Sequence, residues 1–286
     1  MIDEVRVSTA TVSAYCTAFL AFMLVFSAAS GRAELMLYPT RVVIEGNQRT
    51  AQVQLINTGT ESRTYRISLV NRRMSDTGEF SDVVEPLAGE RFAKDLLRFS
   101  PRQVTLVPGE GQTVRIMARK PANLVPGEYR SHLLFSQQPA AETLGRDIET
   151  RQHPGKGIGV MITALIGASI PLIVRHGTLE AELELTQLQL QASGEAQFLA
   201  LSMERSGERS VYGDLAVSFT PRGGAETLVA RANGLAVYFP NRVRRARIAL
   251  EFPQGRPLTE GTLHVRFQEP AEAGGKLLAE AALQVR

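Results

Sequence analysis

Residues 158–174 form a long run in which every second residue is apolar. The apolar row comprises Ile158, Val160, Ile162, Ala164, Ile166, Ala168, Ile170, Leu172 and Val174. A period of two predicts a β-strand with one apolar face. At about 3.3 Å per residue such a strand would extend roughly 55 Å, whereas a usual strand has about 5–6 residues. A strand of this length overhangs a small domain and can offer its apolar row to another chain.

Two plainer interpretations of the run stay open. A transmembrane helix needs roughly 20 apolar residues and has no reason to alternate, and this run contains Gly159, Gly167 and Pro171. A core strand covered by its own domain fits the alternation, but it does not explain the length or the proline, which is confined to strand edges, ends and bulges. An exposed apolar edge is normally avoided unless pairing with another chain is its task.

The chain before this run consists of short segments rich in β-branched and aromatic residues, separated by turn residues. The expected strands are 35–45, 50–57, 63–70, 102–107, 112–119 and 129–137. With the long run they make seven, the number in an immunoglobulin-like sandwich. Residues 71–98 give no clear prediction. The polar stretch 139–157 is a long loop directly before the run, and loops of such length are usually functional or disordered.

Alternation continues after the run and predicts a second all-β domain. Residues 175–178 (RHGT) form the expected joint. The expected strands beyond it are 179–191, 196–205, 213–221, 234–240, 245–252, 261–268 and 276–285. The last of these can also be interpreted as a short helix. The predicted fold class is therefore all-β, with two immunoglobulin-like β-sandwich domains at 34–175 and 176–286.

The N-terminus has the features of a secretory signal. Residues 18–29 are almost uniformly apolar, and Gly31-Arg32-Ala33 fits a small-x-small cleavage site, so residues 1–33 are expected to be removed. The alternative is an uncleaved anchor, although the apolar core is shorter than the ~20 residues that span a membrane. The only cysteine, Cys16, lies inside this segment. The mature chain is thus expected to be exported, to lack a membrane span and a disulfide, and to depend on hydrophobic cores.

Composition and motifs argue against several classes of function. The net charge of +3 is mild, and there is no Trp, so nucleic-acid binding is not expected. The four histidines have no partner at metal-ligand spacing, and no nucleophile elbow, P-loop or dinucleotide-binding glycine pattern occurs. We therefore predict no enzymatic activity, no metal and no cofactor.

Three arginines are candidate binding residues. Arg41 falls in the first expected strand, Arg130 opens segment 129–137, and Arg175 closes the long run. Arginine between apolar strands is costly unless it is paired, and its planar fork suits a carboxylate. For each arginine, a surface position or an internal ion pair is the alternative.

Four segments resemble a known family, the periplasmic pilus-assembly chaperones of the chaperone–usher pathway. They are residues 40–46 (TRVVIEG), 99–116 (FSPRQVTLVPGEGQTVRI), 126–135 (PGEYRSHLLF) and the end of the long run, 172–175 (LIVR). The resemblance covers nearly all of the first domain in order and spacing. In the second domain it rests only on the β-rich pattern.

The resemblance implies two immunoglobulin-like domains in a boomerang arrangement, with a ligand cleft between them. It also implies that the long strand is lent to an incomplete pilus subunit, which is donor-strand complementation. The donor residues would be Ile158, Val160, Ile162, Ala164 and Ile166. Arg41 would hold the subunit's C-terminal carboxylate.

Two departures from the family's pattern concern the anchor. Pro171 stands where the family carries its second anchor, a lysine. Arg130 stands where common members carry a glutamate at the start of the preceding strand. We hypothesise that Arg130, together with Arg175, replaces the missing lysine, because a buried carboxylate needs a second cation. The departures point to a divergent branch of the family, with the archaic one as a candidate.

The leading hypothesis is therefore a periplasmic chaperone that binds pilus or fimbrial subunits and delivers them to an outer-membrane usher. The alternative is a structural or adhesive surface protein that is itself part of a fibre. A fibre subunit should carry its alternating segment at the extreme N-terminus, whereas here the segment is internal. That position favours the chaperone.

Overall fold

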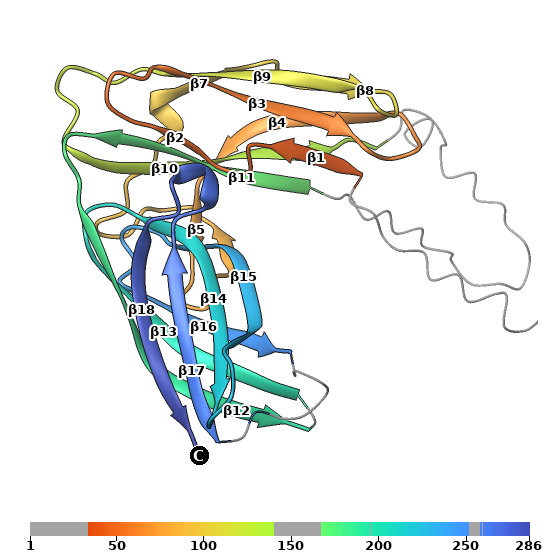
Figure 1. Ribbon diagram of the computed structural model, residues 1–286. Coiled ribbons are helices and arrows are strands. Elements are labelled where there is room, and N and C mark those ends of the chain that lie inside the picture. Colours follow the sequence, from red (N-terminus) through yellow and green to blue (C-terminus); the bar gives the residue numbers. More distant parts are fainter. Residues whose placement is uncertain (1–33, 140–166, 195, 252–257, 259) are drawn as a thin grey trace, which may run out of the picture. The chain divides into compact units, whose positions relative to one another are not determined.

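The computed structural model describes residues 34–139, 167–194, 196–251, 258 and 260–286. Regular structure in these residues is almost entirely β-strand, apart from two short 3₁₀ turns, which confirms the all-β prediction (Figure 1). Residues 35–286 form one compact unit. Among the described residues, no helix is long and apolar enough to cross a bilayer. The expected signal segment, the loop up to residue 157 except for Pro139, and the five donor residues lie outside the described residues.

The first sandwich consists of two sheets. One has the order β1 (Leu35–Tyr38), β3 (Thr50–Asn57), β9 (Gly111–Ala118) and β7 (Leu97–Ser100). The other has the order β2 (Val42–Ile44), β11 (Gly167–His176), β10 (Gly127–Gln137), β4 (Arg63–Val70) and β8 (Gln103–Leu106). A separate hairpin joins β5 (Arg72–Met74) to β6 (Phe80–Asp82). This hairpin and β7 lie largely where the sequence gives no clear prediction.

The expected strand 35–45 is in fact two strands in different sheets. β1 pairs with β3, whereas β2 pairs with β11 on the other side of the core. The break falls at Pro39, which has no N–H to continue a ladder and restricts the residue before it. This change of sheet brings Arg41 to the start of β2, beside the end of β11.

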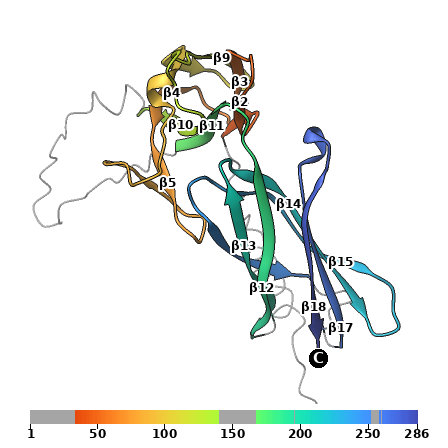
Figure 2. The ribbon, with the colours of Figure 1, turned by 90° about the vertical axis from the view of Figure 1, so that its left-hand side faces the viewer.

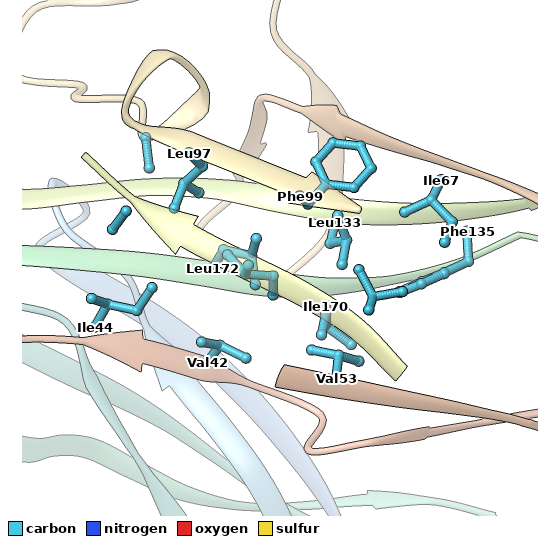
Figure 3. Packing of buried hydrophobic residues seen from close by; sticks show 14 of the residues in the cluster. Val42, Ile44, Val53, Ile67, Leu97, Phe99, Leu133, Phe135, Ile170 and Leu172 are labelled. Carbon is cyan, nitrogen blue, oxygen red and sulfur yellow. The ribbon is translucent and has the colours of Figure 1, made fainter. Parts of the chain in front are cut away.

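The core of the first sandwich lies between its two sheets (Figure 3). Its side chains come from alternate positions of the strands, as the period of two requires. Val53, Leu55, Val114, Leu133, Phe135 and Leu172 are all fully buried. Each Å² of apolar surface removed from water contributes about 25 cal/mol to the free energy of folding, so this layer is the main stabilising feature of the first sandwich. The described residues contain no disulfide to add to it.

The described part of the long run is β11, and its apolar row faces the protein's own core. Ile170, Leu172 and Val174 belong to the first core cluster. β11 pairs with β10 along its whole length, but its other edge pairs with β2 only over Leu172–Val174. The core-strand interpretation therefore holds for this half. Residues 167–171 keep a backbone edge that no described strand covers.

Pro171 sits on β11 without breaking its ladder with β10. Pro171 lies opposite His132, two positions along from the Arg130–Ile173 pair. The Arg130 N–H donates to the carbonyl of Arg91 rather than to β11. Antiparallel pairs alternate between hydrogen-bonded and non-hydrogen-bonded positions, so the missing N–H of Pro171 points to the open edge. The proline removes no bond to β10.

The second sandwich also has two sheets (Figure 2). One contains β12 (Ala181–Ser193), β13 (Ala196–Gly207) and β16 (Val243–Leu250). The other contains β15 (Thr227–Val237), β14 (Val211–Pro221), β17 (Gly261–Gln268) and β18 (Leu277–Val285). The final segment is therefore a strand and not a helix. The core of the second sandwich includes six fully buried side chains, those of Leu199, Leu215, Val217, Leu263, Val265 and Phe267.

A third, small apolar cluster joins residues of the two sandwiches. Met74 of β5 and Ile173 of β11 pack with Ala236 and Tyr238 of the second sandwich. A hydrogen bond from Asn241 Nδ2 to the Met74 carbonyl, 2.7 Å long, lies beside it. Ile173 points away from the first core because it belongs to the opposite row of β11. This opposite face carries the polar residues of the site.

Candidate functional site

A cleft of about 1090 Å³ is lined by residues from both sandwiches. The first sandwich contributes the turn between β1 and β2, with Arg41, and the end of β11, with Arg175. The second contributes Ser210 and Tyr212 near the start of β14. Two of the three arginines singled out from the sequence thus reach one cleft. Arg130 does not line the cleft and lies on the neighbouring strand β10.

Arg41 is held by aromatic rings rather than by carboxylates. Its guanidinium carbon lies 4.6 Å from the centre of the Tyr212 ring and 5.5 Å from that of Tyr238. Its Nη1 is buried and has no hydrogen-bond acceptor among the described residues. Burial lowers the pKa of Arg41, yet a guanidinium stays protonated in proteins. Arg41 is therefore a desolvated cation with donors to spare.

Arg130 is a second cation of the same kind. The residue is only 6% exposed, and its guanidinium carbon lies 4.4 Å from the centre of the Tyr238 ring. Both Nε and Nη1 are buried without a partner in the part of the chain that the structure describes. Burial is the largest cause that lowers the pKa of Arg130, and the charge of Arg41 lowers it further. The two arginines therefore lie within electrostatic reach of each other.

Arg175 differs because acceptors already occupy its donors. Its Nε donates to Glu128 at 3.0 Å, its Nη1 to Glu45 at 3.1 Å and its Nη2 to the carbonyl of Ser210 at 3.4 Å. The Glu128 side chain is 1% exposed. Glu128 also accepts from the backbone N–H of Ser210 at 3.1 Å and from its hydroxyl. Arg175 is thus part of a closed network linking the two sandwiches.

A buried glutamate precedes Arg130 on β10. Glu128 lies directly opposite Arg175. The expected correspondence of Arg130 with a glutamate of the family stays a prediction. Arg130 follows Glu128 on the same face of β10, because residues two apart share a face.

His132 continues this face of β10 beyond Arg130. It is 2% exposed, and its ring packs edge-on against Phe80 with 5.0 Å between centres. Neither ring nitrogen has a partner among the residues that the structure describes. Burial lowers the pKa of His132 to about 3, and the charges of Arg130 and Arg72 add to that effect. His132 is therefore neutral at physiological pH.

The site as a whole carries an excess of positive charge. Arg41, Arg130 and Arg175 lie within electrostatic reach of one another. Two buried carboxylates act on them, but Glu128 is already paired with Arg175 and Glu90 with Arg73. Within the described ranges, Arg41 and Arg130 therefore have no carboxylate partner of their own. Unpaired buried cations are costly, so such a site favours a ligand that supplies an anion. A carboxylate fits best, because the planar fork of arginine binds it through two hydrogen bonds. The described residues contain no group of three metal-ligating side chains.

Sequence reasoning found the arginines and missed the residues that hold them. Glu128, Arg130 and His132 stand at every second position of one strand and so share a face, which makes the period of two a usable signal for finding them. Tyr238 has no such signal, because it lies far along the chain in another sandwich. Only the packing of the second sandwich brings it to the arginines.

No family model and no curated protein sequence matches the chain. Its similarity is to solved structures. The YadV chaperone has 11% identity and a TM-score of 0.44, over 88% of this chain and 100% of that one. The CupB2 chaperone of Pseudomonas aeruginosa has 10% identity and a TM-score of 0.41, over 87% and 99%.

A third similar structure comes from the archaic chaperone–usher Csu pili of Acinetobacter baumannii. It is the pre-assembly complex of the chaperone CsuC with the tip adhesion subunit CsuE. The identity is 15% and the TM-score 0.37, over 72% of this chain and 90% of the matched chain. The chain is similar to pilus chaperones. These values describe a likeness of fold.

Proposed function

We propose that this protein is a periplasmic chaperone that captures pilus subunits and delivers them to an outer-membrane usher. The observation that carries the proposal is the pair of buried arginines, Arg41 and Arg130, whose donors lack acceptors beside a cleft. The uncovered edge of β11 next to them supports it, as does the resemblance of the sequence in the first domain. The protein has no catalytic task in this proposal.

The proposed mechanism begins with the subunit's C-terminal carboxylate. It enters the cleft and accepts hydrogen bonds from Arg41 and Arg130, which replace the donors' missing partners. Because the carboxylate ends the subunit's chain, this contact fixes the register of the residues before it. The subunit's last strand then pairs along the open edge of the long strand.

Apolar side chains complete the capture in this proposal. Ile158, Val160, Ile162, Ala164 and Ile166 belong to the same row as the core residues of β11, and we propose that they fill the subunit's open groove. The main chain supplies affinity, and alternate side chains supply specificity. Capture buries the groove and prevents premature polymerisation until the usher receives the subunit.

Arg175 takes a different part in the proposal. Its donors already serve Glu128, Glu45 and Ser210. We therefore assign the direct contacts with the carboxylate to Arg41 and Arg130. Arg175 keeps Glu128 paired, so that this carboxylate does not compete for the other two arginines.

Co-expression tests the proposal. The chain is produced with a small β-rich secreted protein encoded beside it, and an equimolar periplasmic complex is expected. Arg41→Ala and Arg130→Ala are each expected to weaken capture by about 2–5 kcal/mol, because a buried charged hydrogen bond is lost. Co-purification is quantified after salt washes.

Arg102→Ala is the matched control, because Arg102 also stacks on a ring, that of Phe99 at 4.9 Å, but lies outside the cleft. It is expected to capture normally. Undiminished capture by both Arg41→Ala and Arg130→Ala would refute the anchor. The absence of any complex with wild-type protein would refute the chaperone role.

A further inference from the structure

The ring of Tyr238 contacts both arginines of the proposed anchor. Its centre lies 4.4 Å from the guanidinium carbon of Arg130 and 5.5 Å from that of Arg41. Tyr238 is 6% exposed, and it follows β15 in the second sandwich. One residue of the second sandwich thus touches two cations of the first.

The backbone around Tyr238 is fixed by hydrogen bonds. Its carbonyl accepts from the N–H of Asn241 at 2.8 Å, and the Asn241 side chain donates to Met74 of β5 at 2.7 Å. The ring packs in the apolar cluster with Met74 and Ile173. The ring of Phe80 lies 6.0 Å away, centre to centre. The ring therefore has a defined position before any ligand arrives.

Stacking on a ring stabilises a guanidinium without consuming its hydrogen bonds. The ring attracts the cation through the negative potential of its face. The five N–H donors lie in the plane of the guanidinium and remain available. The contrast with Arg175 is direct, because carboxylates and a carbonyl occupy the Nε, Nη1 and Nη2 of that residue.

The cost of an unoccupied anchor explains why such support is needed. Arg41 and Arg130 are both desolvated, and the charge of Arg41 further disfavours the charged form of Arg130. A glutamate in the place of Tyr238 would relieve this cost but would also occupy the donors. An aliphatic residue would leave the donors free but would offer no attraction.

From this geometry we infer that Tyr238 is a positioning residue, which holds Arg41 and Arg130 by their faces so that their donors stay free for a carboxylate. The inference rests on the proposed function. It adds that the anchor is shared between the sandwiches. Its ligand-binding groups belong to the first, and the ring nearest to each of them belongs to the second, with Phe80 of β6 farther from Arg130 at 5.9 Å.

Graded substitution at position 238 tests the inference. Tyr238→Phe keeps the ring, and 3,4,5-trifluorophenylalanine at the same position keeps its size but removes most of its negative face. The probes are the subunit that co-purifies with the wild-type protein and the same subunit extended at its C-terminus by Gly-Ser-Gly, which displaces the carboxylate. The affinity of each protein for both probes is measured. The affinity for the unmodified subunit divided by that for the extended subunit reports the strength of the carboxylate contact.

Tyr238→Phe is expected to keep the wild-type ratio. The trifluorinated ring is expected to lower that ratio about tenfold, because two desolvated cation–π contacts weaken. The extended subunit is expected to bind the Tyr238→Phe protein and the trifluorinated protein with equal affinity. Equal ratios for the phenylalanine and trifluorophenylalanine proteins would overturn the inference while leaving the proposed function intact.

Two controls distinguish support of the arginines from a general loss of structure. Phe198→Leu removes a different stack, with Arg247 at 3.4 Å from the ring centre, and is expected to leave the ratio unchanged. Equal loss of both subunit forms in the trifluorinated protein would mean a purely structural role and would overturn the inference. Failure of the wild-type protein to capture any subunit would overturn the proposed function, and the inference with it.

Discussion

At the scale of single residues, the three arginines of the candidate site are held in two chemically different ways. Arg175 has its charge matched by Glu128 and Glu45, whereas Arg41 and Arg130 rest on ring faces with donors unused. A matched buried pair is harmful to break, because one charge is left alone. An unmatched buried cation is costly to keep. The pairing of Arg175 therefore stabilises the folded protein. The unpaired charges of Arg41 and Arg130 destabilise it, and binding of an anion would offset that cost.

This difference predicts opposite effects of two substitutions on the free energy of unfolding. Glu128→Ala removes the buried partner of Arg175 and of Ser210, leaves Arg175 with only the exposed Glu45, and is expected to destabilise the protein by about 3–5 kcal/mol. Arg130→Met removes a buried cation with unmade hydrogen bonds and is expected to be neutral or to stabilise by about 1–3 kcal/mol, while subunit capture is lost. Urea denaturation of the free protein measures both. A large destabilisation by Arg130→Met would show that its donors are satisfied.

His132 predicts a dependence of stability on pH. Its pKa is about 3 in the folded protein and about 6.5 when unfolded, so the unfolded chain binds the proton more readily between these values. The stabilisation is complete above pH 6.5 and is lost as the pH falls toward 3. When the pH is lowered from 7 to 5, the free energy of unfolding of the wild-type protein is expected to fall by roughly 2 kcal/mol more than that of His132→Phe.

Urea denaturation at the two pH values checks this expectation. Equal losses in the wild-type protein and His132→Phe would mean that the imidazole is hydrated or paired. Arg130 and Arg72 contribute to the shift through their charges. The Arg72 guanidinium is partly exposed and paired with Asp82. Arg72→Ala is therefore expected to reduce the difference in pH dependence between the wild-type protein and His132→Phe without abolishing it.

At the scale of elements, the alternating row that includes the core residues of β11 has one observed task and one proposed task. Its described residues Ile170, Leu172 and Val174 fill the protein's own core. The residues proposed as donors occupy the same row before residue 167. Alternation alone cannot mark where one task ends, because both need an apolar face at every second position.

Two charged substitutions separate these tasks. Ile170→Asp is expected to unfold the first sandwich, because an uncompensated carboxylate would replace a side chain that is 3% exposed. Ile162→Asp is expected to leave folding unchanged and to abolish subunit capture. Circular dichroism and co-purification measure the two effects. Normal capture by Ile162→Asp would refute donor-strand complementation.

The sequence predicts strands well where alternation and turn residues agree. The β3, β4 and β17 boundaries match the expected segments residue for residue. It fails at Pro39, where one apolar segment serves two sheets, and at residues 71–98, where the short strands β5 and β6 carry too few residues to show a period. The site follows the same rule, since Arg130 lies on a recognisable strand and Arg41 directly before one, whereas the support from Tyr238 depends on tertiary packing.

At the scale of the whole molecule, a few specific contacts tie the two sandwiches together. Ser210 binds Glu128, Asn241 binds Met74, and Arg245 pairs with Asp76 of the β5–β6 connection. The small cluster of Met74, Ile173, Ala236 and Tyr238 adds apolar contact. Polar and modest interfaces of this kind allow domains to uncouple when a few contacts are lost.

Calorimetry can measure this coupling. The wild-type protein is expected to unfold in one transition, because the buried Glu128–Ser210 contact links the sandwiches. Ser210→Ala combined with Asn241→Ala is expected to lower the first melting temperature and to split the transition in two. A single transition at the wild-type temperature in the double variant would show that the apolar cluster alone carries the coupling.

The proposed double use of this row would also constrain how the segment can change over generations. Ile170 and Leu172 are locked to the protein's own interior, and in the proposed donor role they set the phase of the row before residue 167. In that role, insertion or deletion of one residue just before Ile170 would turn the donor row to the opposite side, whereas a change of two would preserve its facing. Lineages of this protein should therefore vary in the length of this segment by even steps, and any odd step should coincide with a bulge.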